Sequence, residues 1–266
     1  MTDSATPIYR FVTASRTDIG CVRKINEDSL LALPDAGLWL VADGMGGHAA
    51  GDFASQTIVS QMETIGVPTG AVDLHARFAQ RLAQANRLIF DHARELGGGT
   101  IGSTLAALMV QQGHFACIWS GDSRVYRLRG GVLTRCTRDH TEVRTLLENG
   151  TITPEEAENW PRKNVITKAI GVTAEPDCEM AEGPLADGDT FLICSDGLTE
   201  YFQDEALERQ MVDAGRDLEG LCDRLIAHAL ASGGKDNVSV VAVRCRQEPW
   251  PQMQADGVFP EFVGSL

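Results

Sequence analysis

The stretch LAALMVQQGHFACIW, residues 105–119, decides the class of fold. Two apolar runs rich in β-forming residues, Leu105–Val110 and Phe115–Trp119, flank the turn-forming pair Gln112-Gly113. Strands that are joined by so short a turn pair with each other, so the stretch predicts an antiparallel hairpin.

Short apolar runs between Gly and Asp turns recur along the chain, with a second tight turn predicted at Gly130-Gly131. They predict further strands at Tyr9–Thr13, Leu38–Val41, Val125–Leu128, Phe191–Cys194 and Val238–Val243. Apolar residues at a spacing of three and four predict helices over about 49–65, from Phe78 to Ala93 and from Leu218 to Ala229. Long helices between groups of strands indicate an α+β domain in which helices cover sheets.

No repeat or linker divides the 266 residues. We expect one domain over residues 1–246 and a C-terminal tail over 247–266, which holds three prolines and shows no periodicity. Residues 142–165 are polar and acidic, and Thr153-Pro154 before two glutamates predicts a helix start, so this segment is interpreted as a small helical flap.

Composition limits the function classes. A net charge of −14 argues against nucleic acid and against an anionic membrane as partners. The apolar runs are too short to cross a membrane, and the N-terminus shows no secretory pattern. The seven cysteines are scattered without a CxxC pair, so disulfides and zinc are not expected. The chain is therefore predicted to be cytoplasmic.

Acidic residues stand at the ends of the most apolar predicted strands. Asp43 follows Leu38–Ala42, Asp122 and Asp196 each follow a strand, and Asp236 precedes Val238–Val243. Each Asp taken alone fits an ordinary turn. Together they predict converging carboxylates, which repel each other unless a hard divalent cation is bound. An all-oxygen ligand set favours Mg²⁺ or Mn²⁺ over zinc.

Seven short motifs in a fixed order carry a resemblance to a known family. They are DIGCVRKINEDS (18–29), ADGMGG (42–47) with Ala49-Ala50-Gly51, GST (102–104), GDSR (121–124), RDH (138–140), SDG (195–197) and Asp236-Asn237. Over residues 8–246 the chain resembles the type 2C (PPM) serine/threonine protein phosphatases in their bacterial form. The resemblance implies a sandwich of two antiparallel β-sheets, flanked on both sides by pairs of α-helices, with a small flap subdomain.

The resemblance also implies a centre of two or three Mn²⁺ or Mg²⁺ ions. In it Asp43 bridges two metals, and the backbone carbonyl of Gly44 binds one of them. Asp196 and Asp236 bind the other, and Asp122 belongs to a third, weaker site.

Arg23 matches the arginine that grips the substrate phosphate, and Glu27 matches an acid that holds metal-bound waters. Asn237 is interpreted as support for the Asp236 carboxylate. Two interpretations of Asp28 stay open: contact with the metals through water, or a cap on local backbone.

The chain departs from many eukaryotic members at the general acid. Met45 stands where they have a histidine, and the nearest histidine is His48, which either protonates the leaving group or tunes the rim of the site. His140 is expected to be structural, and Arg124 to support a loop.

The predicted activity is hydrolysis of phosphoserine and phosphothreonine in proteins, by a hydroxide bridging two divalent metals. The alternatives are a catalytically silent phosphoprotein-binding module of the same fold and a hydrolase of small phosphoesters. The expected partners are phosphoproteins, including a cognate Ser/Thr kinase and its substrates, and the expected state is a monomer.

Overall fold

Two antiparallel sheets packed face to face form the centre of the molecule. The computed structural model describes residues 9–46 and 50–247. The first sheet has five strands in the order β1-β11-β10-β7-β8. Their bounds are β1 Tyr9–Asp18, β7 Arg124–Arg129, β8 Val132–Arg135, β10 Thr190–Cys194 and β11 Val238–Gln247.

The second sheet has six strands, ordered β2-β3-β5-β6-β9, with the short β4 paired to β3. Their bounds are β2 Asp28–Leu33, β3 Leu38–Met45, β4 Gly102–Ser103, β5 Leu105–Gln111, β6 His114–Ser120 and β9 Glu179–Pro184. The β5–β6 hairpin predicted from residues 105–119 is confirmed, with Leu105 opposite Ser120 and Gln111 opposite His114.

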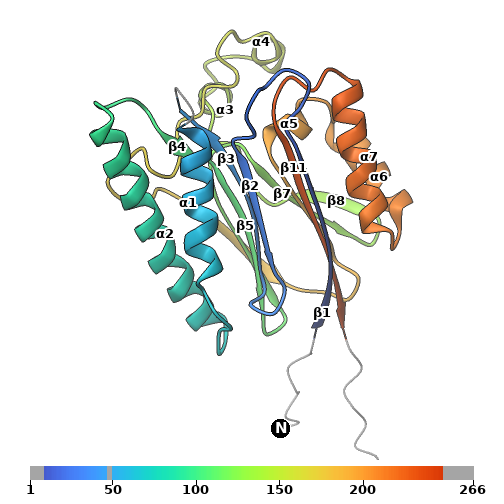
Figure 1. Cartoon of the computed structure of the whole chain (residues 1–266). Helices are drawn as coiled ribbons and strands as arrows, with labels where there is room; N and C mark the ends of the chain where they lie inside the picture. The colour runs from blue at the N-terminus through green and yellow to red at the C-terminus, as the bar shows by residue number, and fades with distance from the viewer. Residues whose placement is uncertain (1–8, 47–49, 248–266) are drawn as a thin grey trace, which may run out of the picture.

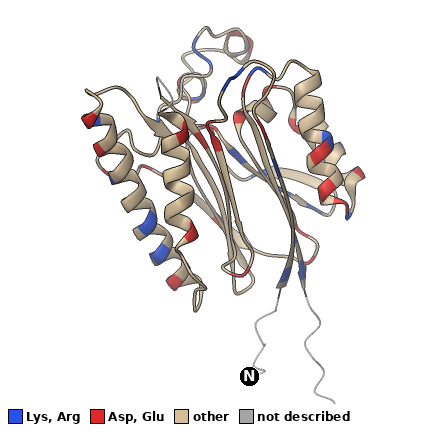
Figure 2. Cartoon of the chain, viewed as in Figure 1, with Lys and Arg blue, Asp and Glu red and all other residues tan. Residues whose placement is uncertain are grey.

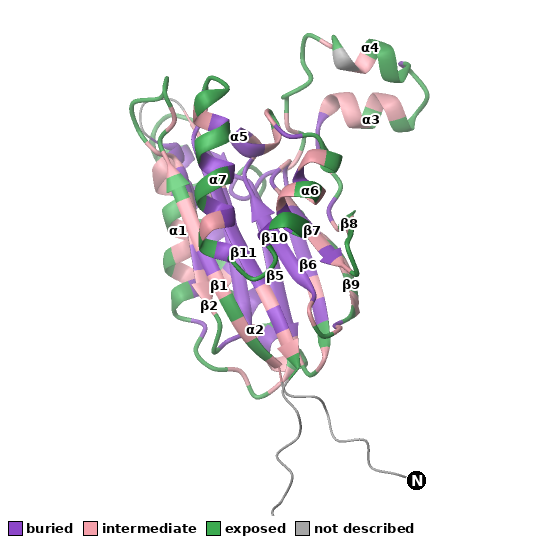
Figure 3. Cartoon of the chain, turned by 90° about the vertical axis from the view of Figure 1, so that its right-hand side faces the viewer, coloured by how far each residue is buried: buried purple, intermediate pink, exposed green. Residues whose placement is uncertain are grey.

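Helices cover the outer faces of both sheets (Figure 1). The longer ones are α1 Gly51–Glu63, α2 Ala71–Glu95, α6 Asp204–Ala214 and α7 Leu218–Ala231. One buried cluster joins α1 and α2 to the six-stranded sheet, another joins α6 and α7 to the five-stranded sheet, and a third lies between the sheets. Figure 3 shows the resulting buried strands between exposed helical surfaces. The predicted sandwich with flanking helix pairs is confirmed.

The flap contains the short helices α3 Glu142–Glu148 and α4 Pro154–Glu158, which project beyond one end of the sandwich (Figure 3). The helix start predicted at Thr153 is confirmed, because the Thr153 hydroxyl accepts a bond from the Glu156 N–H and the Glu156 carboxylate accepts one from the Thr153 N–H. A bridge between Thr141 and Ile166 closes the base of the flap.

The two tight turns predicted from glycine pairs also occur. Gln112 and Gly113, and likewise Gly130 and Gly131, have positive φ values, as hairpin turns that match strand twist require. None of the helices in the described ranges is both long and apolar enough to span a bilayer. The predicted tail, apart from Gln247 at the end of β11, lies outside the described residues.

Candidate active site and metal centre

Five aspartates meet at the end of the sandwich below the flap, where acidic residues gather in Figure 2. Asp28 begins β2 and lies directly opposite Asp43 on β3. Asp122 follows β6, Asp196 is the first residue of the short helix α5 Asp196–Thr199, and Asp236 stands two residues before β11. Carboxylates from both sheets therefore lie together at this end of the sandwich.

Burial and mutual repulsion shift the protonation of these carboxyl groups. Desolvation, followed by the neighbouring aspartates, raises the pKa of Asp43 and of Asp122 well above the usual range. Desolvation also raises the pKa of Asp28 to about 7 and, with the charge of Asp236, that of Asp196 to about 6. The protein alone does not supply enough positive charge for these groups to ionise normally.

The donor set fits a hard divalent cation. Asp28 Oδ1 and Asp196 Oδ1 are buried and accept no hydrogen bond from the described residues. Within residues 9–46 and 50–247 no three acidic, histidine or cysteine side chains form a ready-made metal cage. A hard cation would give both oxygens the partner that they lack.

Glycines let the backbone approach this centre. A Cβ on Gly44 would lie 2.7 Å from the Glu27 carbonyl oxygen, and one on Gly51 would lie 2.8 Å from the carboxyl carbon of Glu27. The Gly44 N–H donates to the Glu27 carbonyl at 3.0 Å. A side chain at either glycine would push the Glu27 loop away from β3.

Glu27 and Arg23 lie on the loop between β1 and β2. The Glu27 carboxylate accepts a bond from the N–H of Gly51 at the start of α1, while burial raises its pKa. Arg23 Nη2 lies 2.7 Å from Asp236 Oδ2, and both side chains are partly exposed. Arg23 is thus within reach of the carboxylate cluster from the solvent side.

Asn237 braces this loop and does so differently from the prediction. Its backbone N–H, and not its side chain, donates to Asp236 Oδ1 at 2.9 Å. The side chain accepts from the Glu27 N–H and donates to the carbonyls of Ile19 and Ile25. Asn237 therefore fixes the segment that carries Arg23 and Glu27.

Three hydroxyl groups to which the sequence analysis gave no role make hydrogen bonds beside the aspartates. Thr104 Oγ1 accepts from the Asp43 N–H at 3.0 Å and lies 2.7 Å from Ser123 Oγ. Ser195 Oγ likewise donates to Asp28 Oδ2 at 2.8 Å. Ser123 and Ser195 each adjoin an aspartate within the quoted motifs, and this adjacency was the available signal.

Arg124 makes a bidentate pair with Asp139, at 3.0 and 2.8 Å, and also donates to the Tyr126 hydroxyl. It is turned to these neighbours, which agrees with its predicted support of a loop.

A cleft of about 320 Å³ lies between the carboxylates and the flap. Asp122 and Asp196 line one side, and Val143, Leu147 and Lys163 line the flap side. A larger hollow, of about 500 Å³, lies at the opposite end of the strands against Tyr9 and Phe11. Only the smaller cleft borders the buried carboxylates, so it is the candidate substrate site.

His48, the predicted candidate for general acid, lies outside the described residues. The other predicted site residues lie at one end of the sandwich. They are linked by hydrogen bonds, by the Arg23–Asp236 ion pair or by the electrostatic interactions described above. This geometry is typical of a protein that binds hard cations on a carboxylate cluster below a partly polar cleft.

Comparison with known proteins gives the family. The family model described as protein phosphatase 2C matches residues 23–231. The serine/threonine protein phosphatase PstP of Mycobacterium tuberculosis is 40% identical over 233 residues, which cover 86% of this chain and 44% of PstP. The serine/threonine phosphatase Stp of Listeria monocytogenes is 34% identical over 236 residues, covering 86% of this chain and 93% of Stp.

Solved structures agree. PppA, described as a key regulatory component of the T6SS in Pseudomonas aeruginosa, superposes with a TM-score of 0.82 at 39% identity, covering 89% of this chain and 98% of PppA. The catalytic domain of PstP in complex with two manganese ions gives a TM-score of 0.79 at 35% identity, covering 90% of this chain and all of that domain. The chain belongs to the protein phosphatase 2C family of metal-dependent serine/threonine protein phosphatases.

Proposed function

We propose that this chain hydrolyses phosphoserine and phosphothreonine in other proteins at the carboxylate cluster below the flap. The observation that carries the proposal is a cluster of buried and half-buried aspartates in which only Asp236 has an ion-pair partner among the described residues. Within it, Asp43 and Asp122 have strongly raised pKa values. Buried acids of this kind are costly to the fold unless they serve a cation. The chain spans less than half the length of PstP. The activity, substrates and partners of this chain are therefore proposed from its own site residues.

The proposed ligands are the Asp43 carboxylate and Gly44 carbonyl, with Asp196 and Asp236 opposite and Asp122 at a third, weaker position. Bound Mn²⁺ or Mg²⁺ ions supply a water of lowered pKa as the nucleophile and neutralise charge on the phosphoryl group. Glu27 accepts hydrogen bonds from water at the site, and its carboxylate is held there against Gly51 at the start of α1.

Arg23 binds the substrate phosphate. Its guanidinium is held near the cluster by Asp236 at 2.7 Å, and its fork could make two hydrogen bonds to phosphate oxygens. The cleft between Asp122 and the flap residues Val143 and Leu147 receives the segment of protein that carries the phosphate. His48, by its place in the sequence, is the proposed general acid.

The partners that fit this site are phosphoproteins, among them a cognate Ser/Thr kinase and its substrates. A catalytic unit over residues 1–246 that works as a monomer in the cytoplasm is part of the same proposal. Support for phosphoprotein substrates comes from the relatives named as serine/threonine phosphatases.

The test is dephosphorylation of a phosphothreonine peptide with and without Mn²⁺, for the native chain and for Asp43→Asn. We expect Mn²⁺-dependent turnover that falls by on the order of 10²–10³-fold or more in the variant, the cost of losing a central electrostatic group. Asp35→Asn, in an exposed turn of the same sheet, is the matched control and should keep native turnover.

Two outcomes contradict the proposal. A folded, Mn²⁺-loaded native protein without turnover on peptides or on small phosphate esters would indicate a phosphoprotein-binding module. Turnover of small esters alone, at the same site, would assign a different substrate class.

A further inference from the structure

His140 makes hydrogen bonds to both the N–H and the carbonyl of Gly121, beside the carboxylate cluster. Its backbone N–H donates to the Gly121 carbonyl at 2.9 Å, and its side-chain Nδ1 accepts from the Gly121 N–H at 3.2 Å. Gly121 has φ +103°, and a Cβ there would lie 2.7 Å from the Thr104 side chain. The backbone just before Asp122 is thus fixed by Thr104 on one side and by His140 on the other.

The imidazole is suited to this contact only when it is neutral. Nδ1 accepts a hydrogen bond, so the ring proton is on Nε2. Burial lowers the pKa of His140 and so favours the neutral form. The ring also stacks on Trp119, whose Nε1 donates to the Arg138 carbonyl.

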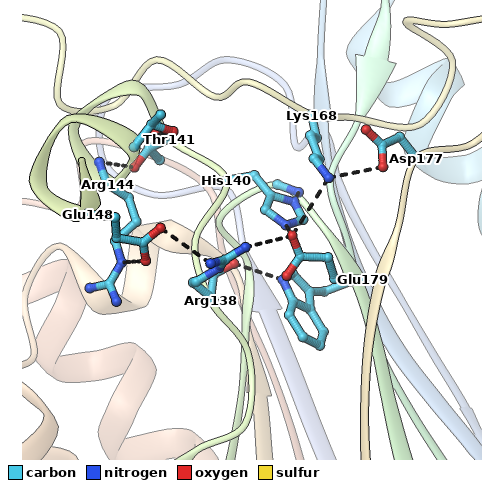
Figure 4. A network of polar contacts seen from close by, with 11 residues as sticks. Arg138, His140, Thr141, Arg144, Glu148, Lys168, Asp177 and Glu179 are labelled. Carbon is cyan, nitrogen blue, oxygen red and sulfur yellow. Dashed lines mark hydrogen bonds and ion pairs between the residues drawn. The ribbon is translucent and has the colours of Figure 1, made fainter.

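Charged groups lie on the far side of the ring (Figure 4). His140 Nε2 lies 3.1 Å from Glu179 Oε1, and that same oxygen lies 2.9 Å from Arg138 Nη2 and 3.7 Å from Lys168 Nζ. Lys168 in turn pairs with Asp177 at 3.0 Å. Nε2 itself makes no hydrogen bond among the described residues, so the Gly121 contact and the stack on Trp119 set the orientation of the ring.

His140 also stands where the flap begins. Its carbonyl accepts from the Thr167 N–H at 2.7 Å, and the next residue, Thr141, caps α3 and bridges to Ile166. One residue thus joins the base of the flap to the turn that carries Asp122.

The position of Asp122 depends on this turn. Its half-buried carboxylate lies near the like charges of Asp196 and Asp139, and no side-chain hydrogen bond or ion pair in the described residues orients it. Its place relative to Asp196 is set by the backbone of Gly121 and by the Ser123–Thr104 contact.

We propose that His140 is a positioning residue. Its hydrogen bonds to Gly121 orient the Asp122 carboxylate for cation binding, and its contacts link that site to the base of the flap. The inference rests on the proposed function, because it assigns Asp122 to a cation. It replaces the expectation that His140 has only a structural role.

The test compares His140→Asn with His140→Leu by counting bound Mn²⁺ in the absence of substrate, from the electron paramagnetic resonance signal of free Mn²⁺. An Asn side chain places its oxygen near the position of Nδ1 and can still accept from the Gly121 N–H, whereas Leu cannot. In His140→Leu we expect the weakest Mn²⁺ to bind about 10–100-fold less tightly, the usual cost of losing a group that orients a metal ligand. The tighter Mn²⁺ ions should bind as in the native chain, and His140→Asn should recover most of the loss.

Thermal melting of every variant separates this role from folding. His140→Gln, whose longer side chain reaches Glu179 and not Gly121, serves as a second test if the Leu variant does not fold, and it should behave as the Leu variant. His228→Leu, which removes an imidazole that packs on Phe202, is the matched control and should bind Mn²⁺ as the native chain does.

Native Mn²⁺ binding in His140→Leu, or equal losses in the Asn and Leu variants, would overturn the inference. Failure of the native chain to turn over phosphopeptide would instead count against the proposed function, because the Mn²⁺ titration does not depend on turnover.

Discussion

Buried aspartates occur at both ends of the sandwich, with opposite surroundings. At the end away from the flap, Asp189 is fully buried and accepts two hydrogen bonds from Arg129, at 2.7 and 2.6 Å, and one from the Ala186 N–H. At the flap end, Asp43 and Asp196 face each other and further aspartates.

The difference separates a structural carboxylate from a functional one. Asp189 is paired within the chain, so its buried charge needs no ligand. Of the flap-end aspartates only Asp236 has an arginine partner among the described residues, and the others raise the free energy of the folded protein until a cation binds. The unpaired end is therefore where chemistry is expected.

The largest expected effect on stability comes from breaking the Arg129–Asp189 pair. Arg129→Met leaves Asp189 buried and without its cation, and should lower the free energy of unfolding by about 3–5 kcal/mol. Urea denaturation measures the loss. Turnover per folded molecule should be unchanged, because the Arg129 pair joins β7 to the β9–β10 region and lies away from the cleft. A stability within about 0.5 kcal/mol of the native value would show that water replaces the arginine beside Asp189.

Much of the fold could be predicted from the sequence. The β5–β6 hairpin and helices α1, α2 and α7 were found because their apolar periodicity is strong. Strand β9, EMAEGP, was missed because it is an edge strand without a fully buried residue and it contains two glutamates, a glycine and a proline. Helix α6 was missed because only Leu207, Met211 and Ala214 of its eleven residues are buried.

The site was predictable in part for a related reason. Asp43 and Asp196 directly follow apolar runs, so their strands place them. The strand β3 runs on through Asp43 to Met45, because Gly44 and Met45 pair with β4. The roles of Asn237 and His140 depend on contacts with Glu27 and Gly121, which are distant in sequence. No local pattern encodes such pairs.

The second prediction concerns pH and metal at the unpaired end. The pKa values of Asp28 and Asp196, about 7 and about 6 in the folded protein, exceed the unfolded value near 3.8. Between about pH 4 and 7 the folded state therefore binds more protons than the unfolded state, so stability falls as pH rises. In EDTA the melting temperature should be higher near pH 5 than near pH 7.5.

Two additions sharpen this measurement. Mn²⁺ should raise the melting temperature more near pH 7.5 than near pH 5, because protons compete with the cation for the carboxylates. Asp196→Asn should weaken the pH dependence seen in EDTA, because one of the groups with a raised pKa is gone. Equal melting temperatures at both pH values, with and without Mn²⁺, would mean that the cluster is hydrated and has ordinary acidity.

The smallest expected effect separates two arginine–aspartate pairs of similar length. Arg23 lies 2.7 Å from Asp236, as Arg129 lies 2.6 Å from Asp189, but the Arg23 pair is partly exposed on both sides. Exposed pairs contribute little to stability, so Arg23→Ala should change the free energy of unfolding by less than about 0.5 kcal/mol. It should raise KM for a phosphothreonine peptide by about tenfold, because a charge-assisted bond to the phosphate is lost. Arg23→Lys should recover only part of the loss, since an ammonium lacks the two-pronged geometry. A variant that lost stability as Arg129→Met does, with unchanged KM, would place Arg23 among the structural pairs and leave the phosphate without its proposed partner.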